Sequence, residues 1–113
     1  MFVAEEKVSR KLVGYALYYY TYSSFLAKRT LYLEDIFVLE EHRKMGVGRN
    51  LFMKCVDEAA KKECGRMEWA VLTWNKNAIK FYEKQGANSL SDWRYYRLTE
   101  DKIATLSKKS PEQ

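Results

Sequence analysis

Basic side chains and glycines gather in residues 43–48 (RKMGVG), and Arg49 follows directly. Glycine lets the backbone approach a ligand closely and turn successive N–H groups toward it. The stretch also precedes a segment of helical periodicity, and a helix begins with unpaired N–H groups at the positive end of its dipole. These features predict an anion site at which a diphosphate would fit. An isolated G-x-G is also compatible with an ordinary helix start.

Two familiar nucleotide motifs do not match this stretch. A Walker loop requires Gly-Lys-Ser/Thr, whereas the chain has Gly48 followed by Arg49 and Asn50. A dinucleotide fingerprint requires a third small residue where Leu51 stands, and its glycines directly follow a strand, whereas residues 40–45 intervene here. Both nucleotide folds are therefore disfavoured.

The acidic pair Glu34 and Asp35 lies in a run typical of a strand, so the two side chains are expected on opposite faces and only one can enter a cleft. A carboxylate in that place could take the proton that an alkylammonium must lose before it becomes a nucleophile. The alternative is a solvated acid at a strand bulge.

The elements that position these residues follow from the period of the hydrophobic pattern. Tyr-rich and β-branched runs predict strands, with residues 23–30 as a loop between two of them. Apolar residues spaced by three and four predict an amphipathic helix from Val47 through Lys62, with Gly65 as its left-handed cap. Asn75 or Asn77 caps a second helix that ends near Gly86, and Thr99 caps a short third one. The predicted strands cover residues 2–5, 12–22, 31–39, 67–74 and 93–98.

The composition bounds the fold class and the environment. A chain of 113 residues with 47% hydrophobic and 31% charged residues is expected to form one domain, residues 1–113, with residues 107–113 frayed. The order of the predicted strands and helices gives its class as α+β (α/β-like). The longest uncharged stretch, residues 12–27, is too short and too polar to span a bilayer. Cys55 and Cys64 lie too far apart on one predicted helix for a disulfide, and a single histidine disfavours a His/Cys zinc site. We therefore expect a cytoplasmic protein without a metal or a membrane partner.

The pattern R-x-x-G-x-G between a strand and a helix resembles the acetyl-coenzyme A motif of the GNAT superfamily of N-acetyltransferases. The segments LYLED before it and WN and FYEKQGA after it resemble the diamine acetyltransferase branch, which contains spermidine/spermine and thialysine enzymes. The resemblance runs from Phe2 to about Leu98. It implies the GNAT fold, a mixed and mostly antiparallel sheet with a central V-shaped splay and flanking helices. It also implies that relatives carry a strand and two helices before the position of Met1, so we expect an N-terminally truncated domain.

The same resemblance implies acetyl-coenzyme A as the cosubstrate. Its pantetheine arm would pair with one strand as an added strand would, its diphosphate would lie on residues 43–48, and the start of the second helix would contact it. The implied cofactor-binding residues are Ile36, Phe37, Val38, Arg43, Lys44, Met45, Gly46, Val47, Gly48, Asn75, Lys76, Asn77 and Ala78.

Two catalytic residues are implied in the same way. Tyr82 would protonate the leaving thiolate, and Glu34 would bind the cationic amine and take its proton, through water. From the residues alone, Tyr82 fits a core aromatic on an apolar helical stripe. The residues implied to lie near the acceptor are Glu34, Glu68, Trp69, Ala70 and Asp92, although the segment before Asp92 is shorter than in relatives.

The sequence thus predicts an N-acetyltransferase that transfers acetyl to a primary amine of a small cationic acceptor, a polyamine, diamine or thialysine-like compound, by direct attack in a ternary complex. The alternative is a catalytically impaired, coenzyme A-binding or dimerising fragment. A nucleic-acid module, suggested by the net charge of +5 and the tyrosines of residues 15–22, is disfavoured because those tyrosines alternate between both faces of a strand. We also expect a homodimer, because a bare sheet surface favours self-association.

Overall fold

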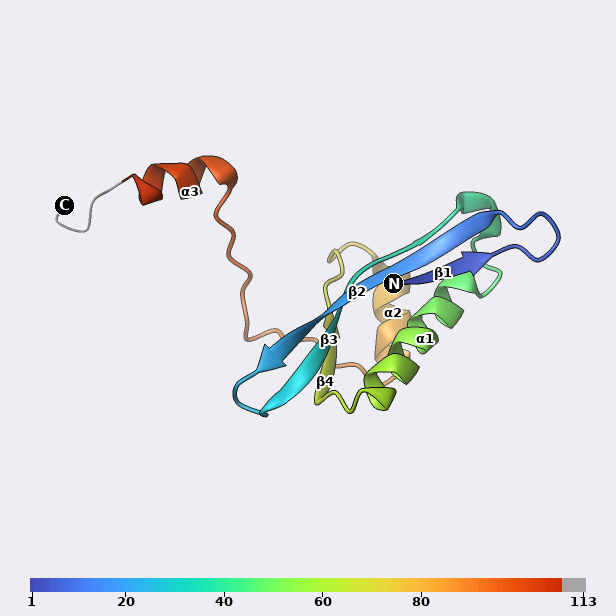
Figure 1. The fold of residues 1–113 in the computed structure, drawn as a ribbon, viewed down its shortest axis with the longest axis horizontal. Helices are drawn as coiled ribbons and strands as arrows, with labels where there is room; N and C mark the ends of the chain where they lie inside the picture. Colours follow the sequence, from blue (N-terminus) through green and yellow to red (C-terminus); the bar gives the residue numbers. More distant parts are fainter. Residues whose placement is uncertain (109–113) are drawn as a thin grey trace. The chain divides into compact units, whose positions relative to one another are not determined.

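A computed structural model describes residues 1–108, and the contacts within the chain divide it into two compact units at Leu72 and Thr73. The first unit holds four strands, a 3₁₀ turn and the longest helix, and the second holds two shorter helices (Figure 1). The elements are β1 (Phe2–Glu5), β2 (Leu12–Ser23), β3 (Lys28–Val38), the 3₁₀ turn η1 (Glu40–His42), α1 (Val47–Lys61), β4 (Arg66–Trp69), α2 (Lys76–Lys84) and α3 (Glu100–Ser107).

The strands form one sheet in the order β1-β2-β3-β4. β1 pairs with β2 and β2 with β3 in antiparallel fashion, whereas β3 and β4 are parallel and are joined through α1. The predicted α+β class with a mixed, mostly antiparallel sheet is therefore confirmed. The loop predicted for residues 23–30 is wrong, because β2 and β3 continue pairing as far as Ser23 and Lys28, which leaves a short connection between them.

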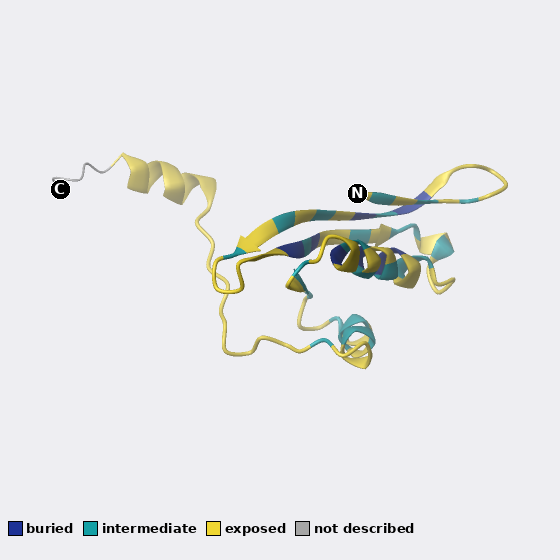
Figure 2. Ribbon diagram, turned by 60° about the horizontal axis from the view of Figure 1, so that its bottom comes forward, coloured by how far each residue is buried: buried dark blue, intermediate teal, exposed yellow. Residues whose placement is uncertain are grey.

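The helix α1 covers one face of the sheet (Figure 2). Its buried residues, Leu51, Phe52, Cys55 and Ala59, recur at the helical spacing that the sequence predicted and form the core with side chains from β2 and β3. Because a helix buries only one stripe, Arg49, Asp57 and Lys61 of α1 are exposed. Glu58 and Lys54 instead reach the sheet, where Glu58 accepts a hydrogen bond from Tyr20 and Lys54 lies over the Phe2 ring. The sheet contributes Val13, Ala16, Leu31 and Leu33 to this core.

The end of α1 differs from the sequence prediction. Glu63, and not Gly65, adopts the left-handed conformation, with φ of 54°. The Cys64 N–H then donates to the Ala59 carbonyl and the Glu63 N–H to the Ala60 carbonyl, which is a Schellman cap. Cys64 therefore lies beyond the helix. Gly65 has a different role, since a Cβ atom there would lie only 3.1 Å from the Lys28 Cβ at the start of β3.

Two predicted strands are shorter or absent. The strand predicted for residues 67–74 is β4, which ends at Trp69, and residues 93–98 form no strand within the described part of the chain. An extended segment becomes a strand only by pairing with another, and residues 93–98 have no such partner among residues 1–108. Of the tail predicted to fray, Ser107 ends α3, and residues 109–113 lie outside the described residues.

Candidate functional site

β3 extends beyond its parallel neighbour. The pairing with β4 runs from Thr30 to Leu33, whereas the pairing with β2 continues to Val38. The β4-facing edge of β3 is consequently open after Leu33 within residues 1–108. An open edge presents unpaired main-chain groups with which an extended amide chain can pair.

The register decides which main-chain groups face this open edge. Gly14 lies opposite Val38, and the Leu39 N–H donates to the Val13 carbonyl over 2.8 Å. In an antiparallel ladder this geometry makes Gly14 and Val38 a non-hydrogen-bonded pair, so the N–H and C=O of Val38 point away from β2. The N–H and C=O of Ile36, two residues earlier, also point away from β2, whereas the N–H and C=O of Phe37 point toward β2. Of the three residues expected to pair with the cofactor, two thus offer main-chain groups to the open edge.

Glu34 lies at a β-bulge, at the point where β4 ends. Leu17 pairs with Asp35 and Tyr18 with Leu33, so Glu34 has no partner on β2. A bulge interrupts the alternation of a strand and re-aims the side chain at that position. The side chain is exposed, and it makes no hydrogen bond or ion pair with residues 1–108. The bulge that the sequence left as an alternative for Glu34 is therefore present, and it coincides with the separation of the two strands.

The other acid of the pair is already engaged. The Tyr15 hydroxyl donates to the Asp35 Oδ2 over 2.7 Å, and the Tyr15 ring contacts the Phe37 ring at 5.8 Å between centroids. This hydrogen bond, more than any burial, raises the pKa of Tyr15. These side chains lie on the sheet face opposite α1, because the neighbouring Gly14 faces Leu51 of α1.

Residues 43–48 adopt an irregular turn before α1. Lys44 and Gly46 have positive φ, 67° and 82°, and Gly46 is the N-cap of the helix. Within residues 1–108 the amides of Lys44, Met45 and Gly46 donate to no backbone carbonyl. The first three amides of α1 are also without an intrahelical acceptor. Successive N–H groups whose residues alternate between right-handed and left-handed backbone conformations form a concave anion-binding site. These residues therefore fit a diphosphate.

Glu68, Trp69 and Ala70 occupy the end of β4. Glu68 lies beside Tyr32 on β3 and within 3.8 Å of Arg66. The Trp69 ring packs edge-on against Phe52, with centroids 5.2 Å apart, which directs it to the α1 side of the sheet. Ala70 is exposed directly after the strand. These three of the five residues expected near the acceptor therefore point in more than one direction.

The second unit carries the remaining predicted residues. The Asn75 side chain accepts from the Ala78 N–H at 3.3 Å, which makes Asn75 rather than Asn77 the cap of α2. Tyr82 lies on the partly buried face of α2, and burial raises the pKa of its hydroxyl above the ordinary 10.0. A hydroxyl with a raised pKa stays protonated at neutral pH, as a proton donor must be. Asp92 is exposed in a turn.

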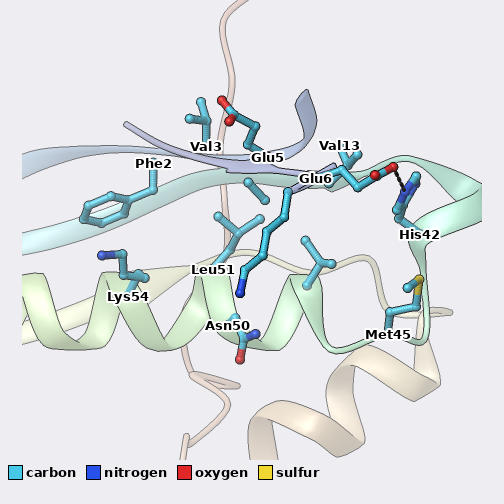
Figure 3. A pocket seen from close by; sticks show the side chains of 13 residues that line it. Phe2, Val3, Glu5, Glu6, Val13, His42, Met45, Asn50, Leu51 and Lys54 are labelled. Atoms are coloured by element: carbon cyan, nitrogen blue, oxygen red, sulfur yellow. Dashed lines mark ion pairs between the residues drawn. The ribbon is translucent and has the colours of Figure 1, made fainter. Parts of the chain in front are cut away.

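A cavity of about 530 Å³ lies between β1 and α1 (Figure 3). It is lined by apolar side chains such as Val13 and Leu51, with His42 at one end, 3.9 Å from Glu6. Met45 and Val47 are the only predicted site residues in its lining. The cavity is therefore separate from the open edge of β3.

Residues 1–108 contain neither a metal-binding cluster nor a helix that could cross a membrane. No cluster of three or more His, Cys, Asp or Glu residues has the arrangement needed to hold a metal ion. None of the helices in this part of the chain is long and apolar enough to cross a membrane.

Sequence reasoning missed two features of this region, the Tyr15–Asp35 hydrogen bond and a hydrogen bond from Arg43 to Val38. Both join residues whose relation depends on strand register or on the course of a turn. No local pattern in the sequence carries that information.

Comparison with known proteins identifies the family to which the chain belongs. The family model described as "Acetyltransferase (GNAT) family" matches residues 1–87. An L-ornithine N5-acetyltransferase of Arabidopsis thaliana is 43% identical over 97 residues, and a thialysine N-epsilon-acetyltransferase of Bos taurus is 38% identical over 101 residues. Among solved structures, an integron cassette protein from the mobile metagenome of V. cholerae superposes with a TM-score of 0.81 and 28% identity, over 88% of this chain and 62% of that one.

The matches cover most of this chain but only part of the relatives. The ornithine enzyme is matched over 86% of this chain and 42% of its own length, and the thialysine enzyme over 87% and 59%. The chain therefore spans about half the length of these curated relatives.

Proposed function

The chain belongs to the GNAT acetyltransferase family, and from this premise we propose that it transfers an acetyl group from acetyl-coenzyme A to a primary amine of a small cationic acceptor. The observation that carries the proposal is the continuity of the open β3 edge with the turn at residues 43–48. An extended amide chain can pair along the edge while an anion lies on the free amides of the turn. Acetyl-coenzyme A combines these two chemical features, a pantetheine arm with amides and a diphosphate.

The N–H and C=O of Ile36 and the N–H of Val38 would hold the pantetheine arm in this arrangement, since the Val38 carbonyl already accepts from Arg43. The amides of residues 44–48 would hold the diphosphate, with Lys44 adding positive charge beside them. Asn75, Lys76, Asn77 and Ala78, at the start of α2, remain proposed cofactor contacts.

The chemistry proposed for the chain is direct attack without an acyl-enzyme. Glu34, exposed at the bulge, takes a proton from the ammonium, directly or through water, and leaves the amine lone pair free to attack the thioester carbonyl carbon. The C–S bond then breaks, and Tyr82 gives its hydroxyl proton to the departing thiolate. The nitrogen, which carries a positive charge after the attack, loses its second proton as the amide forms, and this proton restores the Tyr82 hydroxyl. The buried Cys55, with its pKa raised to about 11 mainly by burial, is unsuited to carry the acetyl group.

The acceptor class is proposed from the chemistry of the relatives. Their names specify ornithine and thialysine, which are both amino acids with a second, terminal amine. Glu34 and Glu68 supply carboxylates at the point where β3 and β4 separate, which suits a cationic acceptor. Trp69, Ala70 and Asp92 remain proposed acceptor contacts. Polyamines and diamines carry the same terminal ammonium group, so they also belong to the proposed class of acceptors.

One pair of measurements tests the proposal. Calorimetric titration with acetyl-coenzyme A is expected to show saturable binding, and a thiol-release assay with ornithine, thialysine and a series of diamines is expected to show turnover. Binding without turnover on any acceptor would favour the alternative, a coenzyme A-binding fragment. Absence of binding, together with steeply salt-dependent association with single-stranded nucleic acid, would contradict the acetyltransferase proposal.

We also propose that the chain forms a homodimer through the sheet face opposite α1, and that it acts in the cytoplasm. Exposed apolar side chains on that face, including Val3, Leu17, Tyr19 and Phe37, support self-association. Sedimentation at high micromolar concentration is expected to give a dimer, and Leu17→Lys is expected to give a monomer. Val8→Lys, in the exposed turn between β1 and β2, is the matched control. A wild-type monomer under these conditions would contradict the dimer.

A further inference from the structure

Arg43 occupies part of the open edge of β3. Its Nε–H donates to the Val38 carbonyl over 2.9 Å, and its guanidinium carbon lies 5.9 Å from the centroid of the Phe37 ring. The register turns that carbonyl away from β2, so it is one of the acceptors that the open edge presents. A side chain from the turn is therefore hydrogen-bonded to the strand that leads into it.

We propose that Arg43 is a positioning residue, and that what the site requires at this position is a hydrogen-bond donor to the Val38 carbonyl rather than a positive charge on the diphosphate. The bond ties the end of β3 to the first residue of the turn and so fixes where the free amides of residues 44–48 lie. As far as cofactor binding is concerned, this inference rests on the proposed function.

The contacts around the turn support this role. Between Val38 and Arg43 the chain is held by backbone bonds within η1, from His42 to Leu39 and from Arg43 to Glu40. The Arg43 bond is the side-chain contact that closes this segment back on the strand. Positive charge near the turn does not depend on Arg43, because Lys44 and Arg49 flank the same amides.

Two substitutions of Arg43 distinguish a requirement for a hydrogen-bond donor from a requirement for positive charge. The Nε2 of glutamine is the same number of bonds from Cα as the Nε of arginine, so Arg43→Gln keeps an N–H donor in place and removes the charge. Arg43→Lys keeps the charge and puts a methylene group where the donor was. Arg43 is exposed, so neither change is expected to unfold the chain, and circular dichroism checks this.

The first test is calorimetric titration of both variants with coenzyme A. We expect Arg43→Lys to bind about five- to tenfold more weakly than Arg43→Gln, the effect of losing one hydrogen bond in an otherwise unchanged site. Lys61→Gln, at the far end of α1, is the control for net charge and is expected to match the wild type. The reverse order, with Arg43→Gln the weaker binder, would show that Arg43 acts through its charge and would overturn the inference.

The second test needs no ligand. Amide hydrogen exchange at Leu39, His42 and Arg43, whose N–H groups are hydrogen-bonded in the free chain, is expected to be faster in Arg43→Lys than in Arg43→Gln. Equal exchange in the two variants would overturn the inference even if coenzyme A binds. Failure of the wild type to bind coenzyme A would instead refute the proposed function, and the exchange comparison would still decide the role of Arg43.

Discussion

The Tyr15 hydroxyl donates to the Asp35 carboxylate over 2.7 Å, across β2 and β3 and beside the bulge at Glu34. Two adjacent acids are thereby given different chemical situations. Asp35 is hydrogen-bonded to a tyrosine on the face opposite α1, whereas the Glu34 side chain makes no hydrogen bond or ion pair within residues 1–108. Of the two, Glu34 is therefore the carboxylate that we propose accepts a proton from the amine.

Replacement of Glu34 tests this distinction. Glu34→Gln is expected to lower kcat on the order of 10²-fold, because the amide cannot accept the proton of the ammonium, and to leave the Kd for coenzyme A close to that of the wild type. The measurement is steady-state thiol release with saturating amine, accompanied by calorimetry.

Asp35→Asn is the matched control, since an asparagine oxygen can still accept the Tyr15 hydrogen bond. A much smaller loss of kcat is expected. If the two variants lose activity equally, or if Asp35→Asn loses more, the base is not Glu34.

Tyr82 is expected to act as an acid, so Tyr82→Phe should lower turnover by about 10²-fold or more and leave acetyl-coenzyme A binding nearly unchanged. Because burial raises the pKa of Tyr82 above 10.0, the hydroxyl keeps its proton at neutral pH and loses it only above that value. The wild-type rate should therefore fall at alkaline pH, and Tyr82→Phe should lack that fall. Unaltered turnover in the variant would remove the role assigned to Tyr82.

The two glycines of the turn are expected to differ in what they tolerate. Gly46 has φ of 82°, where a side chain is strained although no atom lies within 4 Å, so Gly46→Ala should cost about 1–2 kcal/mol of unfolding free energy. Gly48 lies in α1, and a Cβ atom there would meet the Val38 Cγ2 at an ordinary 3.7 Å. Gly48→Ala should stabilise by about 0.5–1 kcal/mol. Urea unfolding measures both, and equal effects would contradict the conformational argument.

Tyr20 links β2 to α1 by donating to Glu58 over 2.9 Å. Burial and this hydrogen bond raise the pKa of Tyr20 from 10.0 to about 12. A raised pKa means that the folded state favours the protonated form, so this contribution to stability is complete below pH 10 and is lost as the pH rises to about 12. Urea unfolding should show a smaller loss of stability over this interval in Tyr20→Phe than in the wild type. In a spectrophotometric pH titration, the tyrosine that ionises at about pH 12 in the wild type should be missing from the variant.

The sequence alone determined the parts of this protein that depend on local pattern. The helical stripe of Leu51, Phe52, Cys55 and Ala59, the first strands and the mixed α+β class follow from hydrophobic period, and the turn at residues 43–48 follows from glycine and charge before a helix. These features depend on residues close together in the chain, where steric and hydrogen-bonding preferences act directly.

The tertiary structure decided what depends on pairing between distant segments. The register of β2 and β3 alone directs the main-chain N–H and C=O groups of Ile36 and Val38 to the open edge, and those of Phe37 away from it. The β-bulge places Glu34 at the point where β4 ends. The same dependence explains why residues 93–98, with the composition of a strand, form none, since a strand is completed by a partner that its own residues do not specify. A one-residue shift in pairing would exchange the faces of every side chain in a strand, and no local pattern encodes it.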